Sequence, residues 1–249
     1  MPELQEGPRA ATVARITLEG HGGVAVEAIH ARPDDEPVRG LVLHPDMGGI
    51  RTLFDDLCRR LATHGLAVCA PEPWARVPDA ERATLDVTAR MDRMRDRDDT
   101  TYLGDLARAR DHLRATDRVA DVAVLGFCMG GMYALKAAAT GAFDRAVVFY
   151  GMIRIPEEWR GPGQGEPLDV ADDACPTLAI FGDADPWTPA ADIEALRAAW
   201  TGRSEHEIVV YPGADHGFVH DPSRPAHRPD DAADAWRRAL AFLGTADAR

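Results

Sequence analysis

The stretch VAVLGFCMGGMYAL, residues 122–135, determines which fold the chain is expected to adopt. It opens with an apolar run typical of a strand covered on both faces, and a helix-like pattern follows without an intervening loop. Cys128 lies at the junction, with Gly126 two residues before it and Gly130 two residues after it. Glycines at this spacing leave room for a tight strand-to-helix turn. The stretch therefore predicts an elbow that projects a thiol from the end of a strand.

The start of the predicted helix gives this thiol a favourable environment. The unpaired N–H groups and the dipole of a helix N-terminus favour a thiolate at Cys128 and a developing oxyanion beside it. The alternative is that Cys128 is a small buried apolar residue, which is the commonest fate of a free cysteine. The residues that follow the later strands decide between these interpretations.

Strand-like and helix-like segments alternate along most of the chain. The runs 12–18 and 23–30 flank a Gly-rich turn and predict an N-terminal antiparallel hairpin. The later alternation predicts a mostly parallel central sheet covered by helices on both faces, in one α/β domain over residues 1–249. Further strands are expected at 38–44, 65–71, 121–127, 145–151, 176–182 and 207–213, and helices at 52–64, 102–113, 131–140 and 236–242.

Composition narrows the range of possible functions. With 249 residues and 45% apolar side chains, the chain is expected to fold as a soluble globular domain. Its 41 acidic against 28 basic residues give a net charge of −13, which disfavours nucleic acid and anionic membranes as partners. No leader-like or membrane-length apolar stretch is present, so we expect a cytoplasmic protein.

The four cysteines carry no pattern of paired thiols. They are widely spaced and form no CxxC motif, so we expect reduced thiols rather than disulfides or a zinc ribbon. Cys58 and Cys69 fall within a helical and a strand pattern and are expected in the core. The charged segment 72–100 is predicted to be a helix with a solvated face.

Two acidic residues and one histidine follow later strands, where sites in open α/β sheets gather. The stretch FGDADPWTP presents Asp183 and Asp185, and PGADHGF presents His216. Aspartates are also common in turns for purely structural reasons. However, a nucleophile, an acid and a histidine in this chain order, each after a successive strand, form the α/β-hydrolase arrangement. The order favours a catalytic role for Cys128.

Four motifs together resemble those of the dienelactone hydrolase family. They are GFCMGG at the elbow, GDADPWTP at the acid, GADHGF at the histidine and GLAVCAPEPWAR earlier in the chain. The resemblance extends over about residues 10 to 245 and implies an α/β-hydrolase fold. The family pattern G-x-x-D selects Asp185, the third residue after Gly182, as the acid.

The resemblance also implies a role for each matching residue. Cys128 would attack the carbonyl carbon of an ester or lactone, His216 would transfer the proton, and Asp185 would orient the imidazole. The backbone N–H groups of Met129 and Met47 would form the oxyanion hole. No cofactor and no metal are expected.

Family members also carry a glutamate that contacts the resting thiol and two arginines that hold a substrate carboxylate. By resemblance, Asp46 takes the position of the glutamate, Arg76 that of the first arginine and His220 that of the second. Asp46 is alternatively a loop cap, and Arg76 a surface charge. Because histidine is only partly charged near neutral pH, His220 weakens the case for a strongly anionic lactone.

A metal site is a poor interpretation of the histidines near the C-terminus. His216 and His220 have the spacing of a helical ligand pair, but glycine and proline in HGFVHDPSRP indicate a loop. His227 adds no recognisable third-ligand spacing. We therefore expect no metal.

The leading hypothesis is a hydrolase of small esters or lactones that works through a Cys-His-Asp triad and a thioester intermediate. A thiol nucleophile suits activated acyl groups, such as enol lactones, aryl esters and thioesters, better than amides. The alternatives are a noncatalytic scaffold that binds a small ligand, a general carboxylesterase or thioesterase, and a redox-sensing thiol. The expected partner is a small molecule, bound by a monomer or small homo-oligomer.

Overall fold

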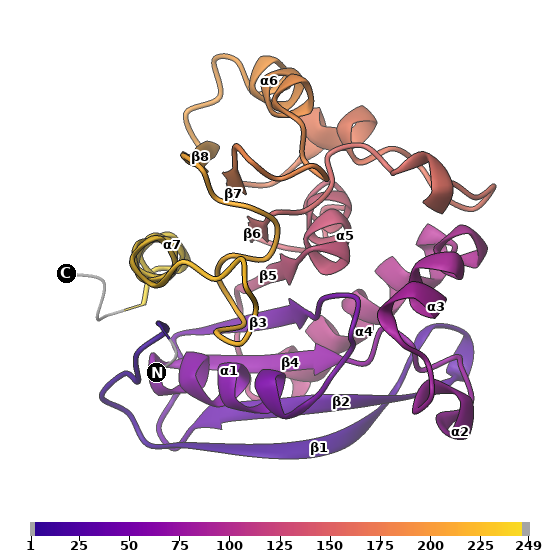
Figure 1. Ribbon diagram of the computed structural model, residues 1–249. Helices are drawn as coiled ribbons and strands as arrows, with labels where there is room; N and C mark the ends of the chain where they lie inside the picture. Colours follow the sequence, from indigo (N-terminus) through magenta and orange to yellow (C-terminus); the bar gives the residue numbers. More distant parts are fainter. Residues whose placement is uncertain (1–2, 246–249) are drawn as a thin grey trace.

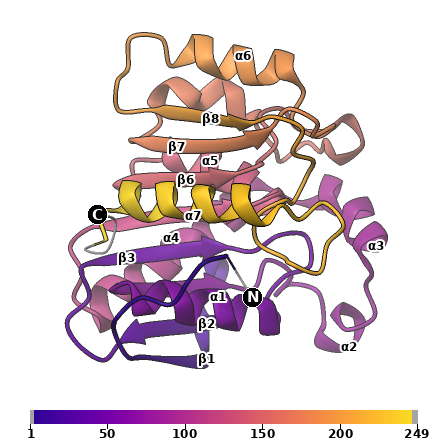
Figure 2. The ribbon, with the colours of Figure 1, turned by 60° about the vertical axis from the view of Figure 1, so that its left-hand side comes forward.

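The computed structural model describes residues 3–245, which build one eight-stranded mixed sheet. The strand order is β1-β2-β4-β3-β5-β6-β7-β8, and Figure 2 shows the strands rising from β1 at the bottom to β8 at the top. The pairs β1–β2 and β2–β4 are antiparallel, and the remaining pairs are parallel. The strands are β1 (Ala11–Glu19), β2 (Ala25–Pro33), β3 (Arg39–His44), β4 (Leu66–Pro71), β5 (Val122–Phe127), β6 (Arg145–Phe149), β7 (Thr177–Gly182) and β8 (Glu207–Tyr211).

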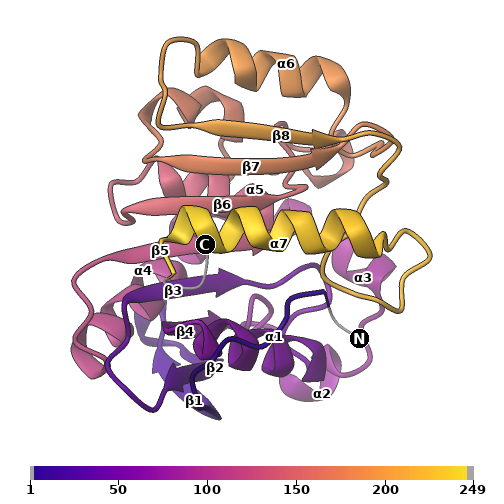
Figure 3. The ribbon, with the colours of Figure 1, turned by 90° about the vertical axis from the view of Figure 1, so that its left-hand side faces the viewer.

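Helices cover both faces of this sheet. Helices α1 and α7 lie on one face, whereas α4, α5 and α6 pack on the other (Figures 1 and 3). The predicted fold class and its N-terminal hairpin are thus confirmed. The main helices are α1 (Thr52–Thr63), α4 (Asp99–Thr116), α5 (Met129–Ala138), α6 (Ala190–Ala199) and α7 (Pro229–Leu243); short 3-10 turns are η1 (His21–Gly23), η3 (Glu157–Trp159) and η4 (Pro167–Asp173). No helix within residues 3–245 is long and apolar enough to cross a membrane.

The apolar patterns explain these placements. All six residues of β5 are buried because helices cover the sheet on both sides there. Helix α1 turns an apolar stripe at helical spacing towards the sheet, made of Phe54, Leu57, Cys58 and Leu61. Cys58 and Cys69 are both fully buried, as predicted.

The segment between β4 and α4 differs from the predicted solvated helix. It forms three short helices, α2 (Asp79–Arg82), α3 (Val87–Asp92) and η2 (Met94–Asp96). Arg97, directly after them, is 2% exposed, and its guanidinium carbon lies 4.6 Å from the ring centre of Trp74 and 3.4 Å from that of Tyr102. Because the segment forms three short helices, the prediction of one helix is wrong. The predicted solvated face is found for most charged side chains of the segment, which are exposed or partly exposed, and Arg97 is an exception because aromatic faces stabilise its buried guanidinium.

The strand order also fixes where a site can form. The chain passes from β3 to β4 on one side and then returns to β5 on the other side of β3. Loops that leave the carboxyl ends of β3 and β5 therefore diverge and leave a crevice between them. The elbow at Cys128 and the loop around Met47 are these two loops.

Candidate active site

The elbow places Cys128 between β5 and α5 in a strained backbone conformation. Its φ of 57° and ψ of −122° are uncommon for a residue with a side chain. A Cβ on Gly126 would meet the carbonyl group of Gly130, and a Cβ on Gly130 would meet the carbonyl oxygens of His44 and Pro45. The two glycines therefore let strand, helix and the β3 loop approach closely.

Gly130→Ala is expected to lower the free energy of unfolding by about 3 kcal/mol, because the added methyl group meets backbone atoms that cannot rotate away. Gly141→Ala is the matched control: its Cβ meets open space, and its φ of 71° costs about 1 kcal/mol. Urea denaturation of both variants checks the difference. Equal destabilisation would show that the close approach at the elbow is not what requires glycine.

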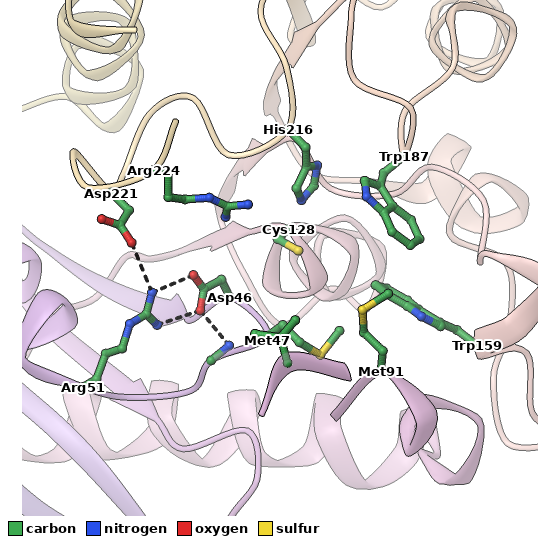
Figure 4. Close-up of a pocket in the computed structure, with 12 residues that line it drawn as sticks. Asp46, Met47, Arg51, Met91, Cys128, Trp159, Trp187, His216, Asp221 and Arg224 are labelled. Carbon is green, nitrogen blue, oxygen red and sulfur yellow. Dashed lines mark hydrogen bonds and ion pairs between the residues drawn. The ribbon is translucent and has the colours of Figure 1, made fainter. Parts of the chain in front are cut away.

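His216 and Asp185 meet beside the thiol. His216 lies in the loop after β8, and its Nδ1 is 2.7 Å from Oδ2 of Asp185. The other carboxylate oxygen of Asp185 accepts the backbone N–H of Trp187 at 2.8 Å, which fixes the acid. Figure 4 shows the imidazole ring of His216 above the sulfur of Cys128. Asp183 does not reach the histidine; its carboxylate accepts the N–H of Gly213.

The surroundings of His216 favour its charged form. Burial alone would lower the pKa of His216, but the charge of Cys128 and hydrogen bonds to Asp185 and Cys128 outweigh it and raise the pKa to about 10. The imidazole is therefore held as an imidazolium at neutral pH. An imidazolium beside a thiolate is the state needed for nucleophilic attack by sulfur.

A buried glutamate and a tryptophan fix the loop after β3. Glu72 accepts the backbone N–H groups of Ile50 and Trp74, each at 2.9 Å, and burial raises the pKa of its carboxyl. The indole N–H of Trp74 donates to the carbonyl oxygen of Met47 at 2.9 Å. This arrangement fixes the carbonyl group of Met47, a residue that lines the same cavity as Cys128. The role of Glu72 and Trp74 was not predicted from the sequence, although both lie in the motif GLAVCAPEPWAR.

Cys128, His216 and Met47 line a cavity of about 480 Å³, a size typical of small-molecule sites. Figure 4 shows Cys128 near its centre, with the sulfur turned towards the open space. The cavity is lined by Asp46, Met47, Gly48, Arg51, Val87, Met91, Cys128, Trp159, Trp187, His216, Asp221 and Arg224.

Asp46 and His220 are hydrogen-bonded to each other, and neither is hydrogen-bonded to the thiol of Cys128. The carboxylate of Asp46 accepts Nη1 and Nη2 of Arg51 at 2.7 and 2.9 Å, the N–H of Gly48 at 2.8 Å and Nε2–H of His220 at 2.8 Å. Burial alone would raise the pKa of this carboxyl, but the bonds from His220 and Arg51 hold it well below its usual range. These contacts agree with the alternative interpretation of Asp46 as a residue that caps its loop.

His220 itself is fully buried. Burial lowers its pKa, so the ring is neutral, with Nε2–H donating to Asp46 and Nδ1 accepting from the hydroxyl group of Tyr150. It does not line the cavity, so the structure does not place it where a substrate carboxylate would bind.

The structure also places Arg76 away from the cavity. Its guanidinium forms two bonds to Asp105, one of them 3.0 Å long, and donates to the carbonyl oxygen of His21. Arg51 and Arg224 line the cavity instead. Arg51 pairs with Asp46, whereas the guanidinium of Arg224 has no ion-pair partner among residues 3–245. The position of Arg224 was not predicted from the sequence. No signal in the sequence separates Arg224 from neighbouring surface arginines, because its loop has no periodic pattern.

The remaining thiols and histidines form no second centre. Burial raises the pKa of Cys58, Cys69 and Cys175, the last to about 11, and none of the three lines the cavity. In the described part of the chain, no three His, Cys, Asp or Glu side chains gather in a way that could hold a metal ion.

Solved structures share this architecture. A crystal structure from Klebsiella pneumoniae subsp. pneumoniae, described as a "Putative Dienelactone Hydrolase", matches with a TM-score of 0.84 and 29% identity, over 94% of this chain and 98% of that chain. Together with the sheet order and the elbow, this likeness defines an enzyme of the α/β-hydrolase fold.

Sequence comparison gives the family. The model of the dienelactone hydrolase family matches residues 26–246, and the chain belongs to this family. It is a hydrolase of ester or lactone bonds. An Escherichia coli protein named "Putative carboxymethylenebutenolidase" is 32% identical over 96% of this chain and 90% of its own length. A Bradyrhizobium protein named "Probable 2-oxo-3-(5-oxofuran-2-ylidene)propanoate lactonase" is 31% identical over 82% of this chain and 82% of its own length.

Proposed function

We propose that the chain hydrolyses a small ester or lactone with Cys128 as nucleophile, His216 as acid and base, and Asp185 as the residue that orients His216. The observation that carries this proposal is the contact of all three side chains at a strained elbow that opens into a cavity. The curated relatives named for lactone substrates support the same bond type.

The first half of the reaction forms a thioester. The thiolate of Cys128 attacks the carbonyl carbon, a C–S bond forms, and the carbonyl π electrons move onto oxygen. Backbone N–H groups of Met129 and Met47 stabilise this oxyanion. As the tetrahedral intermediate collapses, the C–O bond to the leaving group breaks, and His216 donates its proton to the departing oxygen.

The second half releases the acid. Neutral His216 removes a proton from a water molecule, whose oxygen attacks the thioester carbon. The C–S bond then breaks, and the thiolate and imidazolium are restored. Asp185 keeps Nδ1 protonated throughout, so that the other ring nitrogen faces the reacting groups.

In this scheme Asp46, His220 and Arg76 do not touch the reacting atoms. We infer that Asp46 and His220 support the loop that carries Met47, and that the thiol is activated by His216 without a second carboxylate. Cytoplasmic residence stays a prediction from the sequence.

The test is hydrolysis of 4-nitrophenyl acetate and of the cis and trans dienelactones by the native chain and by Cys128→Ala. We expect turnover of at least one of these substrates that the variant loses. Equal rates in both proteins would contradict the proposal and leave the noncatalytic scaffold as the better account.

The raised pKa of His216 predicts a pH-dependent stability. Because its pKa is about 10 in the folded chain against an ordinary 6.5, its stabilising effect is complete below about pH 6.5 and is lost as pH rises towards 10. The difference in unfolding free energy between the native chain and His216→Gln should therefore shrink from pH 6.5 to 10, as measured by urea denaturation.

His112→Gln is the control for that measurement. Burial lowers the pKa of His112, so this ring titrates below the tested range. The difference in unfolding free energy between the native chain and His112→Gln should stay constant between pH 7 and 10. A constant difference for His216→Gln over the same range would show that His216 is not held as an imidazolium.

A further inference from the structure

Arg97 is a buried cation without a counter-ion. The residue is 2% exposed, and no carboxylate within residues 3–245 pairs with its guanidinium. Its Nη2 donates to the carbonyl oxygen of Pro73 at 3.1 Å, whereas Nε and Nη1 have no hydrogen-bond partner in this described part of the chain. Burying an unpaired charge is costly, so other contacts must offset the cost.

Three aromatic rings surround this guanidinium. Its central carbon lies 3.4 Å from the ring centre of Tyr102, 4.6 Å from that of Trp74 and 5.4 Å from that of Tyr133. The attraction between a cation and an aromatic face is stronger when both are removed from water, and Trp74 is itself buried. The attraction acts on both partners, so the contact that stabilises Arg97 also restricts the ring of Trp74.

The side chain of Trp74 in turn fixes one peptide group of the loop after β3. Its indole N–H donates to the carbonyl oxygen of Met47 at 2.9 Å. The N–H of Gly48, at the other end of the same peptide group, donates to Oδ1 of Asp46 at 2.8 Å. This peptide group is therefore held at both ends, and it adjoins the peptide group that carries the N–H of Met47.

The N–H of Met47 must be placed accurately if it is to stabilise an oxyanion. A hydrogen bond weakens steeply when its donor turns away from the acceptor, and the loss of one such donor slows acyl transfer by about 100-fold or more. Met47 lines the cavity, below Cys128 in Figure 4. A rotation of the neighbouring peptide group should therefore slow the acylation of Cys128.

Building on the proposed function, we propose that Arg97 and Trp74 are positioning residues for the oxyanion hole. Arg97 fixes the ring of Trp74, and Trp74 fixes the peptide group that follows Met47. Neither side chain lines the cavity, so neither touches the substrate. Their effect should fall on the step in which negative charge forms on the carbonyl oxygen, and not on substrate binding.

Two reactions of the same thiolate separate this role from a general effect on the site. Acylation of Cys128 by 4-nitrophenyl acetate places a negative charge on the carbonyl oxygen before 4-nitrophenolate leaves, so it uses the oxyanion hole. Alkylation by iodoacetamide also forms a C–S bond, but iodide leaves in the same step and no oxyanion develops. Both rate constants are measured by mass spectrometry of the peptide that contains Cys128.

Arg97→Met keeps a similar chain length without the charge, and Trp74→Phe keeps an aromatic ring without the N–H donor. In each variant, we expect the rate constant of acylation to fall by about 30-fold and that of alkylation to stay within about twofold of the native value. Hydrolysis of the thioester passes through an oxyanion too. In steady state, kcat should therefore fall by a similar factor with little change in KM.

Arg93→Met is the control, because it removes an arginine of the same segment that pairs with Glu81 at the surface. Both of its rate constants should be native. Equal falls in acylation and alkylation in Arg97→Met and Trp74→Phe, or native acylation in both, would overturn the positioning role. If circular dichroism shows one of the two variants unfolded, the other decides. If both are unfolded, the positioning role is overturned, because both residues are then needed for the fold itself.

The native chain tells the two proposals apart. If it is acylated at Cys128 and the variants match it, the proposed hydrolase function stands and the positioning role fails. If the native chain is alkylated at Cys128 but is not acylated by the ester, both proposals fail.

Discussion

Replacing Cys128 by alanine or serine is expected to lower kcat/KM for an activated aryl ester by about 10⁴-fold or more. Alanine removes the nucleophile. Serine keeps a similar shape, but its neutral hydroxyl group does not supply the negative charge of Cys128 that contributes to the raised pKa of His216. Alanine and serine, like cysteine, are not branched at Cβ. Both variants should therefore tolerate the strained φ of 57° and keep the elbow.

The control is Cys175→Ser, which changes a partly exposed thiol outside the cavity. It should retain the native kcat/KM. Circular dichroism and thermal melting should show the three variants folded. A Cys128→Ala protein that hydrolyses the ester at the native rate would contradict the assignment of the nucleophile.

Asp185→Asn should lower kcat/KM by about 10³- to 10⁴-fold with little effect on KM. An amide in place of the carboxylate can donate to Nδ1 of His216, which would then carry its proton on the nitrogen that faces the sulfur. The substitution also removes the negative charge of Asp185 that stabilises the imidazolium of His216. The expected loss is therefore in the chemical step and not in binding.

Asp183→Asn is a closely matched control, because the two aspartates are two residues apart in one loop. Asp183 accepts only the N–H of Gly213 and does not contact His216. Its substitution should change kcat/KM by less than about threefold. Equal losses in the two variants would indicate that the loop needs both carboxylates for its shape and that Asp185 has no distinct role.

The sequence predicted those features that depend on local pattern. A short apolar run such as that of β5 is typical of a strand covered on both faces, and the spacing of Gly126, Cys128 and Gly130 is typical of an elbow. Once a parallel sheet was expected, residues after successive strands were expected at one edge. Cys128, Asp185 and His216 meet there for that reason.

Contacts between irregular loops were beyond such reasoning. Asp46 and His220 are 174 residues apart and bond directly, which depends on how two loops pack and not on any periodic pattern. The same holds for Arg76, which pairs with Asp105 on α4, and for Arg224, which lines the cavity in its place. The burial of Arg97 was missed because composition does not show which aromatic rings surround a charge.

The central claim is that Cys128 carries the acyl group during turnover, and rapid-quench mass spectrometry tests it most directly. The native chain is mixed with 4-nitrophenyl acetate, quenched in acid within milliseconds and digested. The account predicts one acetyl group on the peptide that contains Cys128, which appears before steady state and is lost as acetate forms. Steady hydrolysis without this adduct, or the same adduct level on another residue in Cys128→Ala, would contradict it.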